Sequence, residues 1–276
     1  MNHFFKLLHM EVRRFRYILA GLMGVTAIVQ LCALFWTVSK ELKLRETLML
    51  RPEKTDYVFH ELTFAWAMSS AQFWFLVPVF MSITVLSLYI FFIWYRDWVG
   101  RHTFVYRLLM LPTQRRNIYL AKLTAILIFM FVMLSFQLLL LIVENMVFNW
   151  IVPSEQGGSS HFADAVSANQ ALDMLLPHQF GQFVFNNGVG VLAVLVLFTS
   201  ILLERSYRRI GILYGILYAA GCFAAVIVPL TTLGIENPGA YLYPGEIIAI
   251  VLVIAALLLV LSVWLGLRLL ARKITV

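Results

Sequence analysis

The residues of this chain that could carry out chemistry are few and scattered. His161 and His178 lie in one polar stretch, and Asp164 and Asp173 lie between them. These four side chains could in principle bind a metal ion, but their spacing matches no strong ligand pattern, so we expect no metal site. All six histidines fall outside the apolar stretches, and no H-E-x-x-H sequence occurs. We therefore expect no enzymatic activity in this chain.

Four polar residues within or beside long apolar stretches could line a path across a membrane. They are Gln137, Glu144, Asn186 and Asn187. An ionisable group deep in a membrane is costly and usually functional, so Glu144 fits either interfacial solvation or a role in translocation. The two asparagines fit either a gate or the capped start of a helix. No charge relay crosses the middle of the apolar stretches, which makes an ion-driven carrier or a channel the weaker interpretation.

Six apolar segments must position these residues. They cover residues 17–38, 73–94, 118–144, 183–203, 210–233 and 246–270. Each can cross the roughly 30 Å hydrocarbon core, which needs about 20 helical residues. The composition agrees, since 62% of the residues are hydrophobic and only 13% are charged. The sequence predicts an all-α integral membrane protein with six transmembrane helices in residues 17–270, followed by a short tail, 271–276.

The basic residues predict the orientation of these helices. If the N-terminus is cytoplasmic, five of the 21 Lys and Arg residues lie on the outer side, and the rest lie in the cytoplasm: the five are Lys40, Lys43, Arg45, Arg51 and Lys54. This distribution follows the positive-inside bias, so both termini should be cytoplasmic. Topology and anionic lipid also explain the net charge of +7, so we expect no nucleic-acid partner.

Residues 1–16 predict an amphipathic helix at the inner membrane surface. On a helical projection Lys6 and Arg13 lie almost opposite an apolar arc. The arc contains Phe4, Phe5, Leu8, Val12 and Phe15. Such a helix places its rings at the acyl boundary and its cations among lipid headgroups.

Three connections between the apolar segments are long. Two would lie on the outer side, residues 39–72 and 150–182, and the second of these contains no Lys or Arg. The third connection, residues 95–117, is basic and cytoplasmic, and we expect it to be helical up to Pro112, which lacks the amide donor that a helix needs. A cytoplasmic helix held between two spans is suited to receive force from a soluble partner.

The third connection resembles that of the ABC-2 type permeases, the membrane subunits of ATP-binding-cassette transporters. In that family it reads as an acidic residue, Gly-Thr, Leu-Leu, then Pro with a basic residue, and a Lys that opens the next span. The matching residues here are Asp97, Gly100, Thr103, Leu108, Leu109, Pro112, Arg115 and Lys122. The resemblance implies that residues 97–111 are a coupling helix that docks on an ATPase. Arg101 and Arg107 within this helix, and Arg96 just before it, would take part in the docking. It also implies that residues 1–16 are the family's connecting helix.

The resemblance implies partners as well. No G-x-x-x-x-G-K-[ST] phosphate loop occurs, so ATP and Mg would bind to a separate cytosolic ATPase and no cofactor to this chain. Such permeases work as pairs of six-span halves, identical or similar. Gly211, Gly215 and Ala219 form a small-residue stripe that fits packing within the chain as well as dimerisation.

The function that we predict from the sequence is export of an amphipathic or hydrophobic substrate, such as a peptide, drug or lipid-like molecule, by ATP-driven alternating access. The expected location is a bacterial plasma membrane. Two alternatives stay open: a membrane scaffold or sensor subunit that docks the same ATPase without transport, and an ion-driven carrier. The sequence also leaves open whether residues 150–182 form part of an outer gate.

Overall fold

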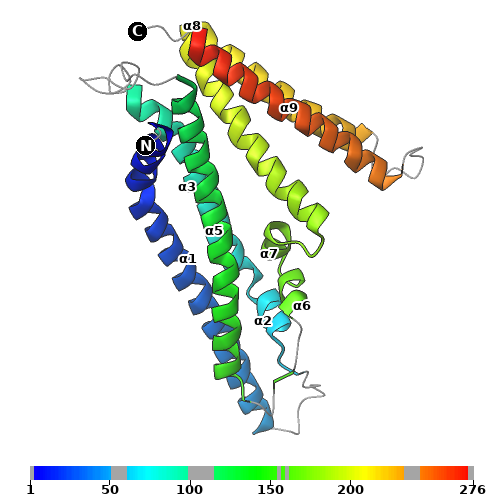
Figure 1. The fold of residues 1–276 in the computed structure, drawn as a ribbon. Helices are drawn as coiled ribbons and strands as arrows, with labels where there is room; N and C mark the ends of the chain where they lie inside the picture. The colour runs from blue at the N-terminus through cyan, green and yellow to red at the C-terminus, as the bar shows by residue number, and fades with distance from the viewer. Residues whose placement is uncertain are drawn as a thin grey trace. The chain divides into compact units, whose positions relative to one another are not determined.

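The computed structural model describes residues 3–50, 61–98, 115–153, 157–158, 162–232 and 243–272 (Figure 1). Its helices are α1 (His3–Met49), α2 (Phe64–Ser70), α3 (Gln72–Trp98), α5 (Arg115–Ile151), α6 (Phe162–Ser167), α7 (Gln170–Leu175), α8 (Phe180–Thr232) and α9 (Pro244–Arg272). In the described part of the chain the only β-type pairing is an isolated parallel bridge between Leu62 and Gly157. The predicted all-helical class is confirmed.

Among the described residues, six helical segments are long and apolar enough to cross a membrane, as the sequence predicts. They are His3–Met49, Gln72–Arg96, Arg116–Ile151, Phe180–Tyr207, Ile210–Pro229 and Ala249–Leu270. Each contains most or all of one apolar segment found in the sequence. The chain is therefore a multi-pass membrane protein.

Helix α1 differs from the prediction of a separate helix at residues 1–16. It runs without a break from His3 to Met49, because no Gly or Pro occurs before Gly21 to interrupt it. At 1.5 Å per residue its length is about 70 Å, more than twice the hydrocarbon thickness. It also continues beyond the predicted span end at residue 38, where Glu41 and Arg45 form an i,i+4 ion pair at 3.1 Å.

Helix α8 contains two predicted spans and reverses direction between them. Its two legs run in opposite directions and meet at a sharp bend (Figure 1). A Cβ atom added to Gly211 would lie 2.4 Å from the carbonyl oxygen of Glu204, and one added to Gly215 would lie 2.9 Å from that of Ser200. Contacts this close between backbones need glycine. The small-residue stripe thus packs against the first leg of its own helix.

Ala219, the third residue of the stripe, takes part in a core that joins α8 to α9. Leu192, Val196 and Cys222 are the buried members of this core, and Ala219 and Leu258 pack against them. Figure 1 shows α9 beside the second leg of α8.

The described chain divides into two compact units, and four of its helices contribute to both. Unit 1 consists of residues 1–14, 86–128 and 187–276, and unit 2 of residues 15–85 and 129–186. Each unit has a hydrophobic core. In unit 1, Leu7 of α1 packs with Ile118 and Ala121 of α5.

Unit 2 contains a small helical cap, which we define as α2, α6 and α7. Both connections that the sequence places on the outer side contribute to it. The buried Asn169 donates a hydrogen bond to the carbonyl oxygen of Met68 at 2.9 Å, and Gly158 donates one to Leu62 at 2.9 Å. The ring of Phe64, in α2, contacts that of Phe148, in α5, and both are buried in the core of unit 2. The two connections are therefore joined into one structure.

Candidate functional site

The last full turn of α3 that the structure describes with side chains lies directly before the segment that the sequence predicts as the coupling helix. We call Ile93, Trp94, Tyr95 and Arg96 the α3 end cluster. All four residues belong to unit 1, and Ile93 and Trp94 are buried. Successive residues of a helix point in directions about 100° apart, so four in a row can reach helices on every side.

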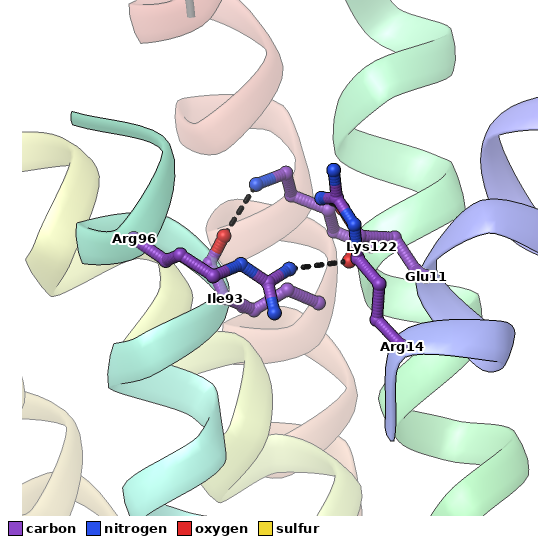
Figure 2. Close-up of polar contacts among 5 residues, drawn as sticks. All are labelled: Glu11, Arg14, Ile93, Arg96 and Lys122. Carbon is purple, nitrogen blue, oxygen red and sulfur yellow. Dashed lines mark hydrogen bonds and ion pairs between the residues drawn. The ribbon is translucent and has the colours of Figure 1, made fainter. Parts of the chain in front are cut away.

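Arg96 connects the cluster to α1. Its guanidinium donates a hydrogen bond to the Glu11 carboxylate at 3.0 Å (Figure 2). Glu11 is only 2% exposed, whereas the Arg96 side chain is 39% exposed. Arg14, one turn along α1, is the second cation near Glu11, at 3.8 Å. This arrangement compensates the charge of a buried carboxylate and fixes the start of α1 to the end of α3.

Lys122 connects the cluster to α5. The residue is 2% exposed. Its ammonium group donates a hydrogen bond to the backbone carbonyl of Ile93 at 2.5 Å (Figure 2) and lies 4.6 Å from the ring centroid of Trp94. Lysine near the end of a span can extend toward water, but here the side chain turns into the protein. A buried cation held by a carbonyl and an aromatic face binds the two helices together.

Trp94 also connects the cluster to α8 through edge-to-face contacts between aromatic rings. Its ring and that of Phe198 are in edge contact at 5.6 Å between centroids, and Phe198 makes a second such contact with Tyr119 of α5 at 5.9 Å. Phe198 and Tyr119 are fully buried. The edge of one ring meets the face of the other, which is the favoured geometry for aromatic pairs.

Tyr95 makes the polar connection to α8. Its hydroxyl donates a hydrogen bond to the Glu204 carboxylate, and the Arg205 guanidinium lies 4.4 Å from the centroid of its ring. Glu204 and Arg205 lie just before the bend between the two legs of α8. The α3 end cluster therefore contacts α1, α5 and α8, so a displacement of the end of α3 would act on three other helices.

The contacts continue from α8 to α9. Thr199 donates a hydrogen bond to the backbone carbonyl of Ser262 at 3.1 Å, and the hydroxyls of Tyr218 and Ser262 are 2.7 Å apart. Gly266 lies so close to Tyr119 that an added Cβ would be 2.9 Å from its ring. Each long helix that the structure describes in unit 1 is thus linked to the end of α3, directly or through one neighbour.

Most of the predicted coupling residues lie outside the described residues. These are Gly100, Arg101, Thr103, Arg107, Leu108 and Pro112. Asp97 belongs to α3 and Arg115 begins α5, but only their backbones are described. Arg96 is the one coupling candidate whose side chain is placed, and it binds Glu11 as described above.

The residues predicted for a translocation path have separate surroundings. Gln137 is buried and donates a hydrogen bond to Gln30 of α1 at 3.1 Å. Asn186 lies inside α8, which begins six residues earlier, so it does not cap the start of that helix. Its amide instead donates to the carbonyl of Met174 at the end of α7, at 2.8 Å. Asn187 belongs to unit 1 and the other three to unit 2.

The apolar arc predicted for residues 1–16 makes contacts within the protein. Phe4 and Leu8 pack against the cluster that Leu7 forms with α5. In unit 2 the Phe15 ring contacts the Phe129 ring in a tilted geometry, with 4.7 Å between centroids. Phe5 remains 58% exposed. The arc is thus largely occupied by contacts within the chain.

Sequence reasoning missed the acidic partners of the α3 end cluster. Glu11 is the only acidic residue before Glu41, and Glu204 is the only one between Asp173 and Glu236. An isolated carboxylate in such a basic or apolar stretch is a signal for a buried ion pair, because burial of the group demands a partner. Within the described residues, no group of three or more His, Cys, Asp or Glu side chains could hold a metal ion.

Comparisons with protein-family models, with curated proteins and with solved structures find no match to this chain.

Proposed function

We propose that this chain is the permease half of an ATP-binding-cassette transporter, with a separate cytosolic ATPase as its source of energy. A second permease half, identical or similar, completes the transporter. The substrate class is amphipathic or hydrophobic, and the direction is outward across a bacterial plasma membrane. The motif between residues 97 and 122 supports the family, and the six membrane-spanning helices agree with it.

One structural observation carries the mechanism: the α3 end cluster contacts three other helices through four consecutive residues. In the proposed mechanism, closure of the ATPase dimer on ATP displaces the segment after residue 98. Arg96 then moves the start of α1, Lys122 moves α5, and Tyr95 moves α8. These helices shift together because each of them is in direct contact with the α3 end cluster, and packed interfaces transmit small displacements in this way. The two halves of the transporter would thereby alternate between inward and outward access.

An ion-driven carrier is the second candidate, and Glu144 is the observation in its favour. Glu144 belongs to α5 and its side chain is fully buried. Buried ionisable groups in membrane proteins are usually functional. A carrier needs no ATPase, so the presence of a bound ATPase separates the two proposals.

The test is gentle purification of the tagged chain from its native membrane, followed by mass spectrometry and an ATP hydrolysis assay. We expect a stoichiometric soluble ATPase that is lost when Asp97 and Arg101 are both changed to Ala. The matched control changes Lys40 and Lys43, two exposed cations of α1, to Ala and should keep the ATPase. Absence of an ATPase in several mild detergents, or its retention by the Asp97→Ala/Arg101→Ala variant, would contradict the proposal. A bound ATPase without a second six-span chain or a dimer would favour the scaffold.

A further inference from the structure

Glu144 is a buried carboxyl group that the proposed mechanism does not use. It lies on α5 in unit 2 and is 0% exposed. Neither of its carboxyl oxygens has a hydrogen-bond partner in the part of the chain that the structure describes. It is also the only ionisable residue of α5 between Phe129 and Ile151.

The surroundings of Glu144 are apolar. Leu141 and Phe148 lie three residues before and four residues after it, so all three side chains share one face of the helix. Both neighbours belong to the core of unit 2, in which Leu34 and Val38 of α1 are also buried. Gln137 lies two turns away on the same face and is hydrogen-bonded to α1. The carboxyl group is therefore enclosed where α1 and α5 pack.

The charged residues of the neighbouring elements do not supply a counterion in the described structure. On α1, Lys40, Lys43 and Glu46 are exposed, and the buried Arg45 is paired with Glu41. Helix α2 and residues 72–85 of α3 contain no ionisable residue. The remaining charged or titratable residues of the described unit 2 beyond residue 40 are Glu61, Asp164, Asp173 and His178, all acidic except the exposed histidine.

A carboxylate in this position has a large electrostatic cost. Transfer of an ionised group into an apolar interior without a partner is so unfavourable that the group takes up a proton instead. A protonated carboxyl group in the same place carries no charge. It has only the cost of a neutral polar group without a hydrogen-bond partner, about 1–3 kcal/mol. The packing of α1 against α5 therefore favours a bound proton over an ionised side chain.

We propose that Glu144 is a proton-binding site. The carboxylate forms an O–H bond with a proton from water when α1 and α5 close around it, and that bond breaks to return the proton when the packing opens to water. Uptake and release balance over one cycle and require no other reactant. This site would make the opening of unit 2 depend on proton concentration, whether ATP or an ion gradient drives the protein.

Infrared spectroscopy of the purified full-length protein at neutral pH tests the proposal directly. A protonated carboxyl group has a carbonyl band that is separate from the carboxylate bands, and an alkyl maltoside micelle contributes no ester carbonyl to that region. We expect the band in the unaltered protein, its loss in Glu144→Gln, and its retention in Glu46→Gln, which changes an exposed glutamate of α1. Transfer to heavy water should shift the band slowly, because exchange requires opening of the core.

Two results would overturn the proposal. One is the absence of a protonated carboxyl band from the unaltered protein, which would mean that Glu144 is ionised and has a cationic partner. The other is a band of equal strength in the folded Glu144→Gln variant. If Glu144→Gln does not fold, the Glu144→Asp variant serves instead: the band must then change frequency, and an unchanged band overturns the proposal.

Discussion

Replacement of Lys122 by Glu is expected to abolish recovery of folded protein, whereas replacement by Met should leave most of it. The ammonium group is buried between the Ile93 carbonyl and the Trp94 ring, so a carboxylate there would meet a carbonyl dipole and a ring face that both repel negative charge. Methionine has a similar length and no charge. The Lys122→Met variant lacks the hydrogen bond from the ammonium group, worth about 1.5–3 kcal/mol, but it also avoids the cost of burying a cation.

The Lys122→Ala variant should fall between these two. It leaves a cavity in the contact between α3 and α5, which in protein cores costs about 2–5 kcal/mol for a side chain of this size. The measurement is the yield of monodisperse protein by size-exclusion chromatography, together with the apparent melting temperature. Lys6→Glu, at an exposed position of α1, is the matched control and should behave like the unaltered protein. A well-folded Lys122→Glu variant would show that the lysine does not hold the helices together.

Arg96→Ala is expected to destabilise the protein more than Glu11→Gln does, although the two residues form one ion pair. The reason is their unequal exposure. Loss of Arg96 removes the closer of the two cations beside the buried Glu11 carboxylate and leaves Arg14 at 3.8 Å. An uncompensated buried charge costs about 3 kcal/mol or more, so this partly compensated one should cost up to about 3 kcal/mol. Loss of the Glu11 charge leaves Arg96, which is 39% exposed and can reach water, so the cost should be about 1 kcal/mol or less.

A double variant provides the control for this asymmetry. Combined with Arg96→Ala, Glu11→Gln should restore part of the lost stability, because a neutral amide is cheaper to bury than a carboxylate. Apparent melting temperatures of the two single variants and the double variant measure this. At about 2–4 °C per kcal/mol for a domain of this size, the expected differences are resolvable. Equal effects of the two single variants, or strict additivity in the double variant, would show that Arg96 does not compensate the buried charge of Glu11 through the contact in Figure 2.

The membrane helices were predictable because a span has a strong local signal. Twenty apolar residues in a row specify a helix in lipid with little help from the rest of the chain. The ends of the helices were less predictable. Helix α1 continues to Met49 through a polar stretch, in which an ion pair between Glu41 and Arg45 stabilises the helix. Hydropathy alone does not detect such a continuation.

The contacts of the α3 end cluster depend on residues far apart in the sequence, so local patterns could not specify them. Glu11 meets Arg96 across 85 residues, and Tyr95 meets Glu204 across 109. The isolated acidic residues indicate that partners are needed, but not which cations they meet. The same limit applies to the two legs of α8. The stripe of Gly211 and Gly215 predicts that another helix approaches closely, but it does not identify which helix.

Site-specific photo-crosslinking tests the central claim, that the segment after α3 docks on a soluble ATPase. A photoreactive phenylalanine analogue would replace Phe104 in living cells, and the crosslinked product would be identified by mass spectrometry. The control places the same analogue at Trp150, an exposed aromatic residue at the far end of α5. We expect Phe104 to crosslink to a soluble protein with a phosphate-binding loop and Trp150 to form no such crosslink. Crosslinks from Phe104 to lipid or to membrane proteins alone would contradict the central claim.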